Sequence, residues 1–389
     1  MRTQEGTTSV GVVGGGQLGR MLAEAGSPLG VELRILDPTP EAPASLGARE
    51  QIVASFTDTD AIISLAERVD VLTYEIELAD PLALERAQAE TGVAVHPDPD
   101  TLRVIQDKLH QNDLLAAAGV PIPAYRAVET PDELRSACEE LGYPAMVKAR
   151  QGGYDGRGNV PIYGPHEAEQ CLDDIGNQPA IVEEFIDFER ELSVIGVRGA
   201  DSKRSAYTPG ENVHEAEILH ETIVPARTSP EVREQALETA HGVLDMLDGR
   251  GVFGIELFER TTGDILVNEI APRPHNSGHW TIEGAITSQF EQHLRAILGW
   301  PLGSTERRTS IVTANILGDG MASQPATLAG VETILADSAA HLHWYGKHEV
   351  RPLRKMGHIA VYDPTEGETD RLLERARSLI GSVSFITSE

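Results

Sequence analysis

The sequence predicts an α/β protein with three consecutive regions, and three observations support this prediction. Apolar runs alternate with helical patterns at the start of the chain, a glycine-rich loop follows an apolar run near residue 150, and short apolar runs separated by turns fill the last part. Strands that alternate with helices form a parallel sheet, whose ligands lie beyond the carboxyl ends of the strands. A chain of 389 residues, at about 100 to 200 residues per domain, is expected to form two or three domains.

The composition is that of a globular protein with an acidic surface. Apolar residues make up 40% and charged residues 24% of the chain, and the formal net charge is −29. This charge argues against a nucleic-acid partner, because such binding draws its affinity from clustered Lys and Arg. No apolar stretch approaches the roughly 20 residues of a membrane span, which argues against a membrane partner. The polar start Met1–Thr8 and the isolated Cys138 and Cys171 predict a cytoplasmic protein.

Lysine is rare in this chain. The 32 basic residues include only five lysines, which are Lys108, Lys148, Lys203, Lys347 and Lys355. An acidic, lysine-poor composition resembles the solvated surface of halophile proteins, and we state this as a hypothesis. If surface lysines have largely been lost, those that remain are more often tied to a specific task.

The first elements are predicted to be a strand, a glycine turn and a helix. The strand covers Ser9 to Val13 and the helix Arg20 to Ala25, with Gly14-Gly15-Gly16-Gln17-Leu18-Gly19 between them. Two more strands are predicted over Val31 to Leu36 and Val69 to Tyr74. Asp37 follows the first of these, whereas Glu75 and Glu77 follow the second.

The glycine turn matches the dinucleotide-binding fingerprint, with Gly14, Gly16 and Gly19 followed by Asp37 at the end of the next strand. The residues of this turn predict an anion site, which is a weaker statement than a dinucleotide site. The glycines let a phosphate or the backbone itself approach a helix N-terminus, where free N–H groups favour any anion. A dinucleotide, another phosphate-bearing ligand and a purely structural turn all remain open on these residues.

A second glycine loop follows the strand predicted over Tyr143 to Lys148. Residues 151–159 contain four glycines, and further strands are predicted over Ala180 to Phe185 and Glu191 to Val197, with a helix over Asp107 to Gly119. A lysine on a strand beside a glycine-rich flap is typical of nucleoside triphosphate sites, because the ammonium group neutralises phosphate charge. The chain has no Gly-Lys-Ser/Thr, which excludes a P-loop. The alternative is a solvated hairpin with an incidental lysine.

Two carboxylates lie on strands that are otherwise apolar. Glu256 belongs to the run Gly251 to Phe258 and Glu269 to the run Asp264 to Ile270, and we expect these runs to form a hairpin. Carboxylates among buried side chains are costly unless they are paired or bind a metal. Adjacent strands that both point such groups at a triphosphate suit Mg²⁺. A salt-bridged structural pair is the alternative.

Polar and basic residues follow in two groups. Directly after the second carboxylate comes Ala271-Pro-Arg273-Pro-His275-Asn-Ser-Gly-His279-Trp280, in which Arg273 offers a planar fork for a small oxyanion and His275 a hydrogen bond or a proton. Residues 347–355 then gather four cations in a very acidic chain, which indicates a phosphate seat. Ordinary loop histidines and solvated surface charges are the respective alternatives.

Together these motifs resemble the ATP-grasp superfamily and, within it, the N5-carboxyaminoimidazole ribonucleotide synthetase family, the ATPase subunit of phosphoribosylaminoimidazole carboxylase. The run Pro-His-Asn-Ser-Gly-His-Trp is highly specific, whereas the first glycine loop is not. The resemblance implies an ATP-grasp fold in three parts: an N-terminal parallel-sheet α/β substrate-binding domain (the pre-ATP-grasp domain) over 1–107, an ATP-grasp region over 108–298 with a glycine-rich flap subdomain over about 120–208, and a small, mostly β C-terminal domain over 299–389 that completes the ribonucleotide site.

The resemblance also implies an activity. ATP would phosphorylate bicarbonate to carboxyphosphate, and 5-aminoimidazole ribonucleotide would be carboxylated to the N5-carboxyaminoimidazole ribonucleotide, with ADP and phosphate as the other products, in purine biosynthesis. Sequestering a short-lived intermediate from water explains the need for a flap. ATP and Mg²⁺ are the implied cofactors, and relatives of this kind are commonly homodimers.

Site residues are carried over from the resemblance position by position. ATP is implied to contact Lys108, Lys148, the flap residues Gly153, Tyr154, Asp155, Gly156, Arg157, Gly158 and Asn159, the adenine hinge Glu183, Glu184, Phe185 and Ile186, and also Glu191, Glu211 and Asn268. Mg²⁺ is implied at Glu256 and Glu269, and the bicarbonate or carboxyphosphate site at Arg273, His275 and Lys355. The ribonucleotide is implied at Gln17, Leu18, Glu75, Lys347, Arg354 and Lys355.

Two positions depart from the family pattern, and three other functions remain as alternatives. Lys108 stands where an arginine is also common, and Glu211 stands where some relatives have histidine. A formate-dependent glycinamide ribonucleotide transformylase shares the first glycine loop and the C-terminal cations, but the Pro-His-Asn-Ser-Gly-His-Trp run favours the carboxylase. An NAD-dependent oxidoreductase leaves Lys148, Glu256 and Glu269 without a task. A nucleotide-binding regulator without catalysis is the third alternative.

Overall fold

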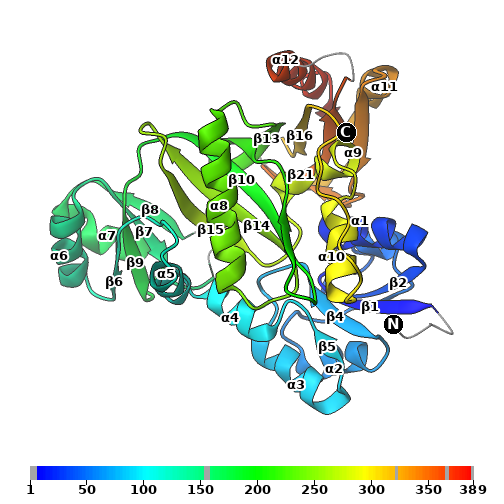
Figure 1. Cartoon of the computed structure of the whole chain (residues 1–389), viewed down its shortest axis with the longest axis horizontal. Coiled ribbons are helices and arrows are strands. Elements are labelled where there is room, and N and C mark those ends of the chain that lie inside the picture. Colours follow the sequence, from blue (N-terminus) through cyan, green and yellow to red (C-terminus); the bar gives the residue numbers. More distant parts are fainter. Residues whose placement is uncertain (1–6, 153–157, 320–322, 364–367, 387–389) are drawn as a thin grey trace.

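The N-terminal part of the chain is a parallel sheet covered by helices (Figure 1). The computed structural model describes residues 7–152, 158–319, 323–363 and 368–386. Within them this sheet has the strand order β3-β2-β1-β4-β5, and all four pairings are parallel. The strands are β1 (Thr8–Val13), β2 (Val31–Leu36), β3 (Glu50–Ile52), β4 (Val71–Tyr74) and β5 (Ala94–Val95), and the helices are α1 (Gln17–Gly26), α2 (Thr59–Ala66), α3 (Pro81–Thr91) and α4 (Pro99–Gln106).

The strand order explains where this sheet offers a site. Val10, Val12 and Val13 are fully buried, as expected of a central parallel strand with helices on both faces. The chain runs outward in one direction from β1 to β2 and β3, and in the other to β4 and β5. Ligands of such sheets bind at this switch point, beyond the carboxyl ends of the strands. The glycine turn after β1 and Glu75 after β4 meet there.

A smaller antiparallel sheet forms the second part. Its order among the described strands is β6-β9-β7-β8, and its core packs one face of the sheet against α6 and α7. The elements are α5 (Lys108–Ala117), β6 (Tyr125–Val128), α6 (Pro131–Leu141), β7 (Ala145–Ala149), β8 (Asn159–Ile162), α7 (Ala168–Asp174) and β9 (Ala180–Glu184). The loop between β7 and β8 contains residues 153–157, which lie outside the described residues.

The largest sheet runs through the centre of the molecule and continues into the C-terminal part. Its path, as far as the chain is described, is β15-β14-β10-β12-β13-β16-β21-β19, with β11 paired to β10. The strands are β10 (Phe188–Arg198), β11 (Arg204–Ala206), β12 (Gly210–Glu215), β13 (Ile218–Val224), β14 (Gly251–Arg260), β15 (Ile265–Ala271), β16 (Ile311–Leu317), β19 (Ala340–Trp344) and β21 (Lys355–Val361). Helix α8 (Pro230–Met246) covers β10, β14 and β15 (Figure 1).

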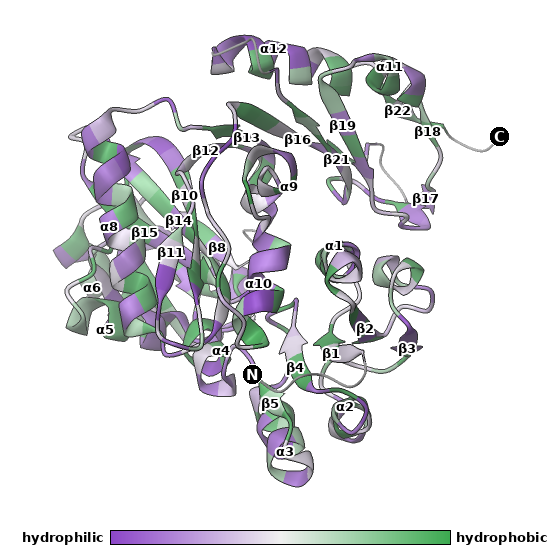
Figure 2. Cartoon of the chain, turned by 45° about the vertical axis from the view of Figure 1, so that its right-hand side comes forward, coloured by the Kyte–Doolittle hydropathy of each residue, from purple (hydrophilic) through white to green (hydrophobic). Residues whose placement is uncertain are grey.

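The C-terminal part shares this sheet and packs against the N-terminal one. Tyr345 belongs to the same apolar cluster as α1, and Figure 2 shows α1 on the side of the N-terminal sheet that faces the C-terminal strands. The remaining elements are α9 (Thr281–Gly284), α10 (Gln289–Ile297), β17 (Gln324–Pro325), β18 (Leu328–Ala329), α11 (Val331–Ala336), β20 (Glu349–Val350), α12 (Thr369–Ile380) and β22 (Ser384–Phe385). The sequence predicted short strands in this region; the structure adds α11 and α12 and joins the strands to the central sheet.

The predicted elements of the first two regions are confirmed to within a few residues. The expected hairpin is the antiparallel pair of β14 and β15. Two short edge strands, β3 and β5, were not predicted. No helix among the described residues is long and apolar enough to cross a membrane.

Candidate active site

Strands β14 and β15 place two carboxylates side by side. Glu256 and Glu269 are direct cross-strand partners. Ile255 and Leu257 pack into the core beneath α8, so Glu256 between them points to the opposite face. A β-bulge lies between the Glu256 and Leu257 pairs and leaves Asn268 without a partner on β14. Because a bulge re-aims the side chains next to it, Asn268 and Glu269 both turn toward the same cluster of lysines.

Two of the five lysines face these strands from the smaller sheet and its helix. Lys148 on β7 is buried; its Nζ lies 2.7 Å from Glu183 Oε2 and donates a hydrogen bond to Asn268 Oδ1 at 3.1 Å. Lys108 at the start of α5 places its Nζ 3.3 Å from Glu269 Oε1. The structure therefore brings together both predicted phosphate ligands and one of the predicted metal ligands.

The two carboxylates differ in their electrostatic surroundings. Burial, followed by the negative charge of Glu269, raises the pKa of Glu256 to about 7. Burial also acts to raise the pKa of Glu269, but the ammonium groups of Lys108 and Lys148 outweigh it and hold that pKa below its usual value. The raised pKa of Glu256 shows that positive charge is lacking around it, and a divalent cation is the natural source of that charge.

The residues present fit Mg²⁺. Carboxylate oxygens are its preferred protein ligands, and Mg²⁺ commonly takes its other ligands from water and substrate phosphates. Among the described residues, no group of three or more His, Cys, Asp and Glu side chains converges as a candidate metal site. Glu256 and Glu269 would thus hold the ion only in part, against a phosphate chain bound at the lysines.

The loop after β15 brings His275 against Glu256. His275 Nε2 lies 3.6 Å from Glu256 Oε1. The approach is possible because residue 254 on β14 is glycine: a Cβ there would lie 2.5 Å from the Cβ of His275. Gln289 holds the loop from below, since its Oε1 accepts from the His275 N–H at 2.9 Å and its Nε2 donates to the His275 carbonyl at 2.7 Å.

The hydrogen bonds of His275 define its tautomer. The backbone N–H of Ser277 donates to Nδ1, and the Ser277 hydroxyl lies 2.8 Å from the same atom. A backbone N–H can only donate, so Nδ1 accepts and the neutral ring carries its proton on Nε2, toward Glu256. Burial, followed by the charges of Arg273 and Lys355, holds the pKa of His275 well below its usual value. The ring is therefore neutral and presents an N–H.

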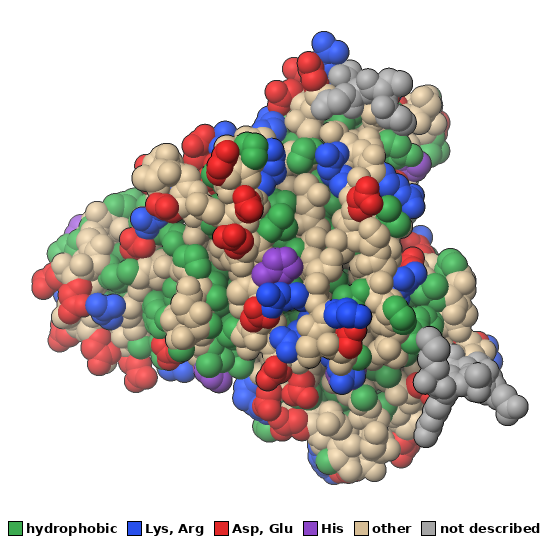
Figure 3. All heavy atoms as spheres, viewed as in Figure 1, with side chains coloured by type: hydrophobic (Ala, Val, Ile, Leu, Met, Phe, Trp, Pro, Cys, Tyr) green, Lys and Arg blue, Asp and Glu red, His purple; other side chains and the backbone are tan. Residues whose placement is uncertain are grey.

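Arg273 and the C-terminal cations surround the same point. Arg273 Nη2 lies 2.7 Å from Oε1 of Glu77, which follows β4 in the N-terminal part. Lys355 begins β21, and its charge acts on the pKa values of Glu256 and His275. Two other predicted cations are held by backbone carbonyls: Lys347 Nζ donates to the Lys355 carbonyl at 2.6 Å, and Arg354 Nη1 donates to the Glu349 carbonyl at 2.6 Å. Figure 3 shows Lys and Arg side chains gathered with a His near the middle of one face.

The first glycine turn holds an anion that belongs to the chain itself. The carboxylate of Glu75 accepts hydrogen bonds from the N–H groups of Gly16 and, at 2.6 Å, Gly19. Asp37 accepts from Gly15 at 2.9 Å. A Cβ on Gly16 would lie 2.9 Å from Glu75 Oε1, so the glycine is needed for this close approach. These contacts account for the fingerprint without a dinucleotide, since side chains take the N–H groups that a pyrophosphate would use.

Glu75 is an unusual carboxylate in this position. Burial raises its pKa to about 7, although the Gly16 and Gly19 hydrogen bonds and the charge of Arg273 act in the opposite direction. Its neighbours Gln17 and Leu18 form the first turn of α1, where Leu18 is buried and Gln17 is half-buried. The predicted ribonucleotide residues of the N-terminal part thus lie together.

The structure does not place Glu211 beside Glu256, Glu269 and the two lysines. Glu211 pairs with Leu192, whose side chain packs beneath α8, so it lies on the face opposite to Glu256. There it binds the guanidinium of Arg227, with Nη2 and Oε1 at 2.5 Å. On the other face His214 Nδ1 lies 3.1 Å from Glu191 Oε2. The role of Glu211 in nucleotide binding stays a prediction, and His214 is its neighbour on the face that carries Glu191 and Glu256.

The remaining predicted nucleotide residues fall into three groups. Gly153, Tyr154, Asp155, Gly156 and Arg157 lie outside the described residues. Gly158 and Asn159 continue from them, and Asn159 pairs directly with Lys148 in the sheet. The segment 183–186 links β9 to β10: Glu183 is the counter-ion of Lys148, Glu184 lies 2.7 Å from Arg260 Nη2, Phe185 is exposed and Ile186 is buried.

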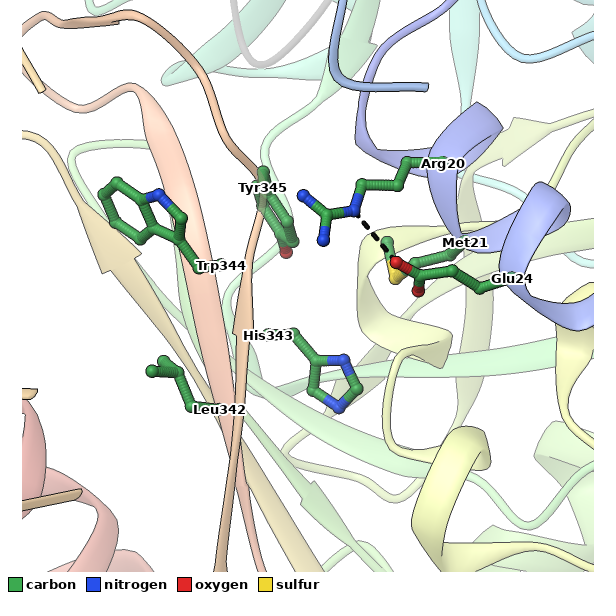
Figure 4. Close-up of a pocket in the computed structure, with 7 residues that line it drawn as sticks. All are labelled: Arg20, Met21, Glu24, Leu342, His343, Trp344 and Tyr345. Atoms are coloured by element: carbon green, nitrogen blue, oxygen red, sulfur yellow. Dashed lines mark hydrogen bonds and ion pairs between the residues drawn. The ribbon is translucent and has the colours of Figure 1, made fainter. Parts of the chain in front are cut away.

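A cavity of about 140 Å³ lies between α1 and β19. Its lining residues are Arg20, Met21, Glu24, Leu342, His343, Trp344 and Tyr345, none of which was predicted as a site residue. In Figure 4 the side chains of His343 and Tyr345 point toward α1, whereas Leu342 and Trp344 point to the other side of the strand.

Three family models match consecutive parts of the chain. They are a ribonucleotide synthetase preATP-grasp domain over residues 7–106, an ATP-grasp domain over 113–290 and a phosphoribosylaminoimidazole carboxylase C-terminal domain over 312–372. Together they follow the three parts of the fold in the same order.

Characterised proteins align with nearly the whole chain. The N5-carboxyaminoimidazole ribonucleotide synthase of Brucella melitensis is 40% identical over 92% of this chain and 97% of its own length. The phosphoribosylaminoimidazole carboxylase of Schizosaccharomyces pombe is also 40% identical, over 93% of this chain and 66% of its own length.

Solved structures give the same result. The N5-carboxyaminoimidazole ribonucleotide synthetase of Thermotoga maritima superimposes with a TM-score of 0.88 at 40% identity, covering 98% of this chain and 100% of that one. The enzyme of Aspergillus clavatus, solved in complex with ADP and 5-aminoimidazole ribonucleotide, gives a TM-score of 0.87 at 35% identity over 96% and 99% of the two chains. This chain belongs to the family of N5-carboxyaminoimidazole ribonucleotide synthases.

Proposed function

We propose that this chain uses ATP to carboxylate 5-aminoimidazole ribonucleotide with bicarbonate, giving the N5-carboxylated nucleotide, ADP and phosphate in purine biosynthesis. The observation that carries the proposal is the convergence of Glu256 and Glu269 with Lys108 and Lys148 on one side and with His275 on the other. Triphosphate ligands and oxyanion ligands then meet at one point, as a phosphoryl transfer to bicarbonate requires.

ATP is proposed to lie between the smaller sheet and the β14–β15 face. Lys148 and Lys108 would exchange their contacts with Glu183 and Glu269 for phosphate oxygens, which are equally good partners for ammonium. Mg²⁺ held at Glu256 and Glu269 would offset the remaining phosphate charge. On the side of the segment 183–186, the pair Glu191 and His214 is proposed to contact the ribose of ATP.

The chemistry proposed for the site proceeds in two steps. An oxygen of bicarbonate attacks the γ-phosphorus, the bond to the β-phosphate oxygen breaks, and ADP leaves carboxyphosphate behind. Carboxyphosphate then divides into CO₂ and phosphate, and the exocyclic amine of the ribonucleotide attacks CO₂ and loses one proton to form the carbamate. Positioning and charge neutralisation, rather than covalent catalysis, are what the protein contributes.

Arg273, His275 and Lys355 are proposed to hold bicarbonate and then carboxyphosphate. In its present tautomer His275 offers an N–H from Nε2, which suits an oxyanion. Taking up the amine proton on Nδ1 would require the backbone N–H of Ser277 to give up its hydrogen bond and the Ser277 hydroxyl to turn from donor to acceptor. We therefore propose that His275 first acts as a hydrogen-bond donor, and a proton-carrying role stays a prediction.

The ribonucleotide is proposed to enter between the N-terminal glycine turn and the C-terminal cations. Glu75, Gln17 and Leu18 would contact it from one side, and Lys347, Arg354 and Lys355 from the other. A homodimer and a cytoplasmic location stay predictions, and light scattering of the purified chain tests the first of them.

One assay tests the proposed function. Phosphate release from ATP is measured with bicarbonate or formate, each with 5-aminoimidazole ribonucleotide or glycinamide ribonucleotide. We expect release with bicarbonate, and stimulation by 5-aminoimidazole ribonucleotide. Stimulation by formate with glycinamide ribonucleotide, and none by the first pair, would replace the proposal with the transformylase alternative.

A further inference from the structure

Three histidines stack in a column between the catalytic loop and the C-terminal strands. The ring centroids of His279 and His358 are 4.7 Å apart at an interplanar angle of 29°, and those of His358 and His343 are 4.4 Å apart at 7°. His279 follows β15 in the loop of His275, His358 lies on β21 and His343 on β19. We call these three residues the histidine column. His343 and His358 are direct partners on neighbouring strands, whereas His279 is 64 and 79 residues from them in sequence, so only the tertiary fold brings it to the other two.

Each ring of the histidine column is also fixed at its edge. The hydroxyl of Tyr345 lies 2.8 Å from His358 Nδ1, and His343 Nε2 lies 2.7 Å from Glu283 Oε1. His279 and His358 are both 1% exposed. Buried rings held by stacking and by hydrogen bonds cannot easily turn or slide, so the column fixes the distance between the loop and the strands.

Two rings of the histidine column lie next to proposed catalytic residues. Gln289 donates to the carbonyl of His275 at 2.7 Å, and its Nε2 lies 3.4 Å from His279 Nδ1, so one side chain holds both histidines of the loop. The middle ring, His358, lies three residues after Lys355 on the same strand. The column is thus a direct mechanical link between His275, on the ATP side, and Lys355, on the ribonucleotide side.

The charges around the column are consistent with neutral, stacked rings. His279 is faced by Arg273, His275 and Lys355 as well as by His343, and burial together with these neighbours holds its pKa well below the usual value. Burial, with the other two rings of the column, does the same for the pKa of His358, which also faces the neutral Tyr345 hydroxyl.

Within the described part of the chain, only the outer ring of the column, His343, meets a carboxylate, that of Glu283 on α9. Two adjacent imidazolium rings at these distances would repel each other, so stacking requires that the inner rings stay uncharged.

We propose that His279 and His358 are positioning residues that set Lys355 against Arg273 and His275, and so couple the cleavage of ATP to carboxylation of the ribonucleotide. This inference rests on the proposed function. When Lys355 is displaced, Arg273 and His275 remain to hold bicarbonate, so carboxyphosphate still forms at the loop, but its CO₂ escapes before the amine captures it. A displacement of about 1 Å can cost about 100-fold in rate, so a loosened column is sufficient to uncouple the two halves.

The test compares variants that keep different properties of His358. His358→Phe keeps a ring for stacking but loses the acceptor for Tyr345, whereas His358→Asn keeps a polar acceptor and loses the ring. The carbamate formed from ¹³C-bicarbonate is measured by NMR against the ADP formed. We expect the ratio of carbamate to ADP to fall at least about tenfold in His358→Asn and to stay within about twofold in His358→Phe. Bicarbonate-dependent ADP formation without ribonucleotide should change less than about threefold in both.

Two further variants complete the design. His341→Asn is the matched control, because His341 lies on β19 like His343 and stacks on Tyr362, with centroids 5.3 Å apart, outside the column. It should leave the ratio unchanged. His343→Asn alters the partly exposed end of the column and should lower the ratio even if His358→Asn does not fold.

The possible results separate clearly. An unchanged ratio in folded His358→Asn and His343→Asn overturns the positioning role. A loss in His358→Phe that equals or exceeds the loss in His358→Asn also overturns it, because the ring that Phe keeps would then not be what holds the distance. A wild-type chain that forms ADP with bicarbonate but no carbamate contradicts both this inference and its premise. A wild-type chain that forms carbamate, with unaffected variants, contradicts the inference alone.

Discussion

Replacing Glu256 by Gln should stabilise the free protein at alkaline pH while it removes activity. Burial and the neighbouring Glu269 raise the pKa of Glu256 from 4.5 to about 7. A rise of about 2.5 pKa units, at about 1.36 kcal/mol each, corresponds to about 3 kcal/mol. Above the pKa that Glu256 has in the folded chain, its carboxyl group is charged in both the folded and the unfolded chain, and the folded chain bears the full cost of the buried charge. As pH falls through about 7 toward 4.5, the folded state takes up the proton first and the cost disappears.

The assay is urea unfolding of the metal-free and nucleotide-free chain between about pH 5 and about pH 8. Glu256→Gln should be more stable than the wild type by up to about 3 kcal/mol at about pH 8, and the difference should shrink steadily toward about pH 5. Glu269→Gln is the control with the opposite sign. Cations hold the pKa of Glu269 below its usual value, so its loss should destabilise the chain at about pH 8. A Glu256→Gln variant that is destabilised at about pH 8 would refute the electrostatic reasoning.

Three further outcomes are expected. Lys355→Ala should raise KM for the ribonucleotide or lower carboxylation per ATP by at least about tenfold, equivalent to about 1.4 kcal/mol, and unchanged values of both would remove Lys355 from the site. His214→Ala should raise KM for ATP about tenfold, whereas Glu211→Gln should change it less than about twofold. Steady-state kinetics measures both values. A larger effect of Glu211→Gln than of His214→Ala would place Glu211 in the nucleotide pocket. The free energy of unfolding should rise between about 0.1 and about 1 M KCl, because the Debye length falls from about 10 to about 3 Å and the acidic surface repels itself less; indifference to salt would end the halophile hypothesis.

Much of the fold is readable from the sequence because its signals are local. The turn from Gly14 to Gly19, the strand with Lys148 and the hairpin with Glu256 and Glu269 each lie within a short window, and each forms as expected. What fills the glycine turn is not local. Glu75 reaches it from β4, 56 residues from Gly19 along the chain, and only the parallel strand order makes the two meet. The motif alone therefore left three occupants open.

The face on which Glu211 lies is not local information either. Glu211 and His214 are close in sequence, but they lie on opposite faces of β12, and only the pairing with β10 decides which face meets Glu191. The alternation of side chains along the strand was the available signal: once Asn212 is paired with Glu191, an even offset brings His214 to the same face. Likewise the ion pair of Glu183 with Lys148 joins β9 to β7 and becomes visible only in the fold, and the place of Glu183 at the adenine hinge stays a prediction.

The proposed activity requires a divalent cation between the two neighbouring strands β14 and β15. A crystal of the chain grown with ADP and Mn²⁺ in place of Mg²⁺ provides the most direct measurement, because the metal gives an anomalous peak. We predict a peak within bonding distance of carboxylate oxygens of both Glu256 and Glu269, beside phosphates bound at Lys108 and Lys148. Nucleotide in place with the metal elsewhere, or with no metal bound by these two carboxylates, would contradict it.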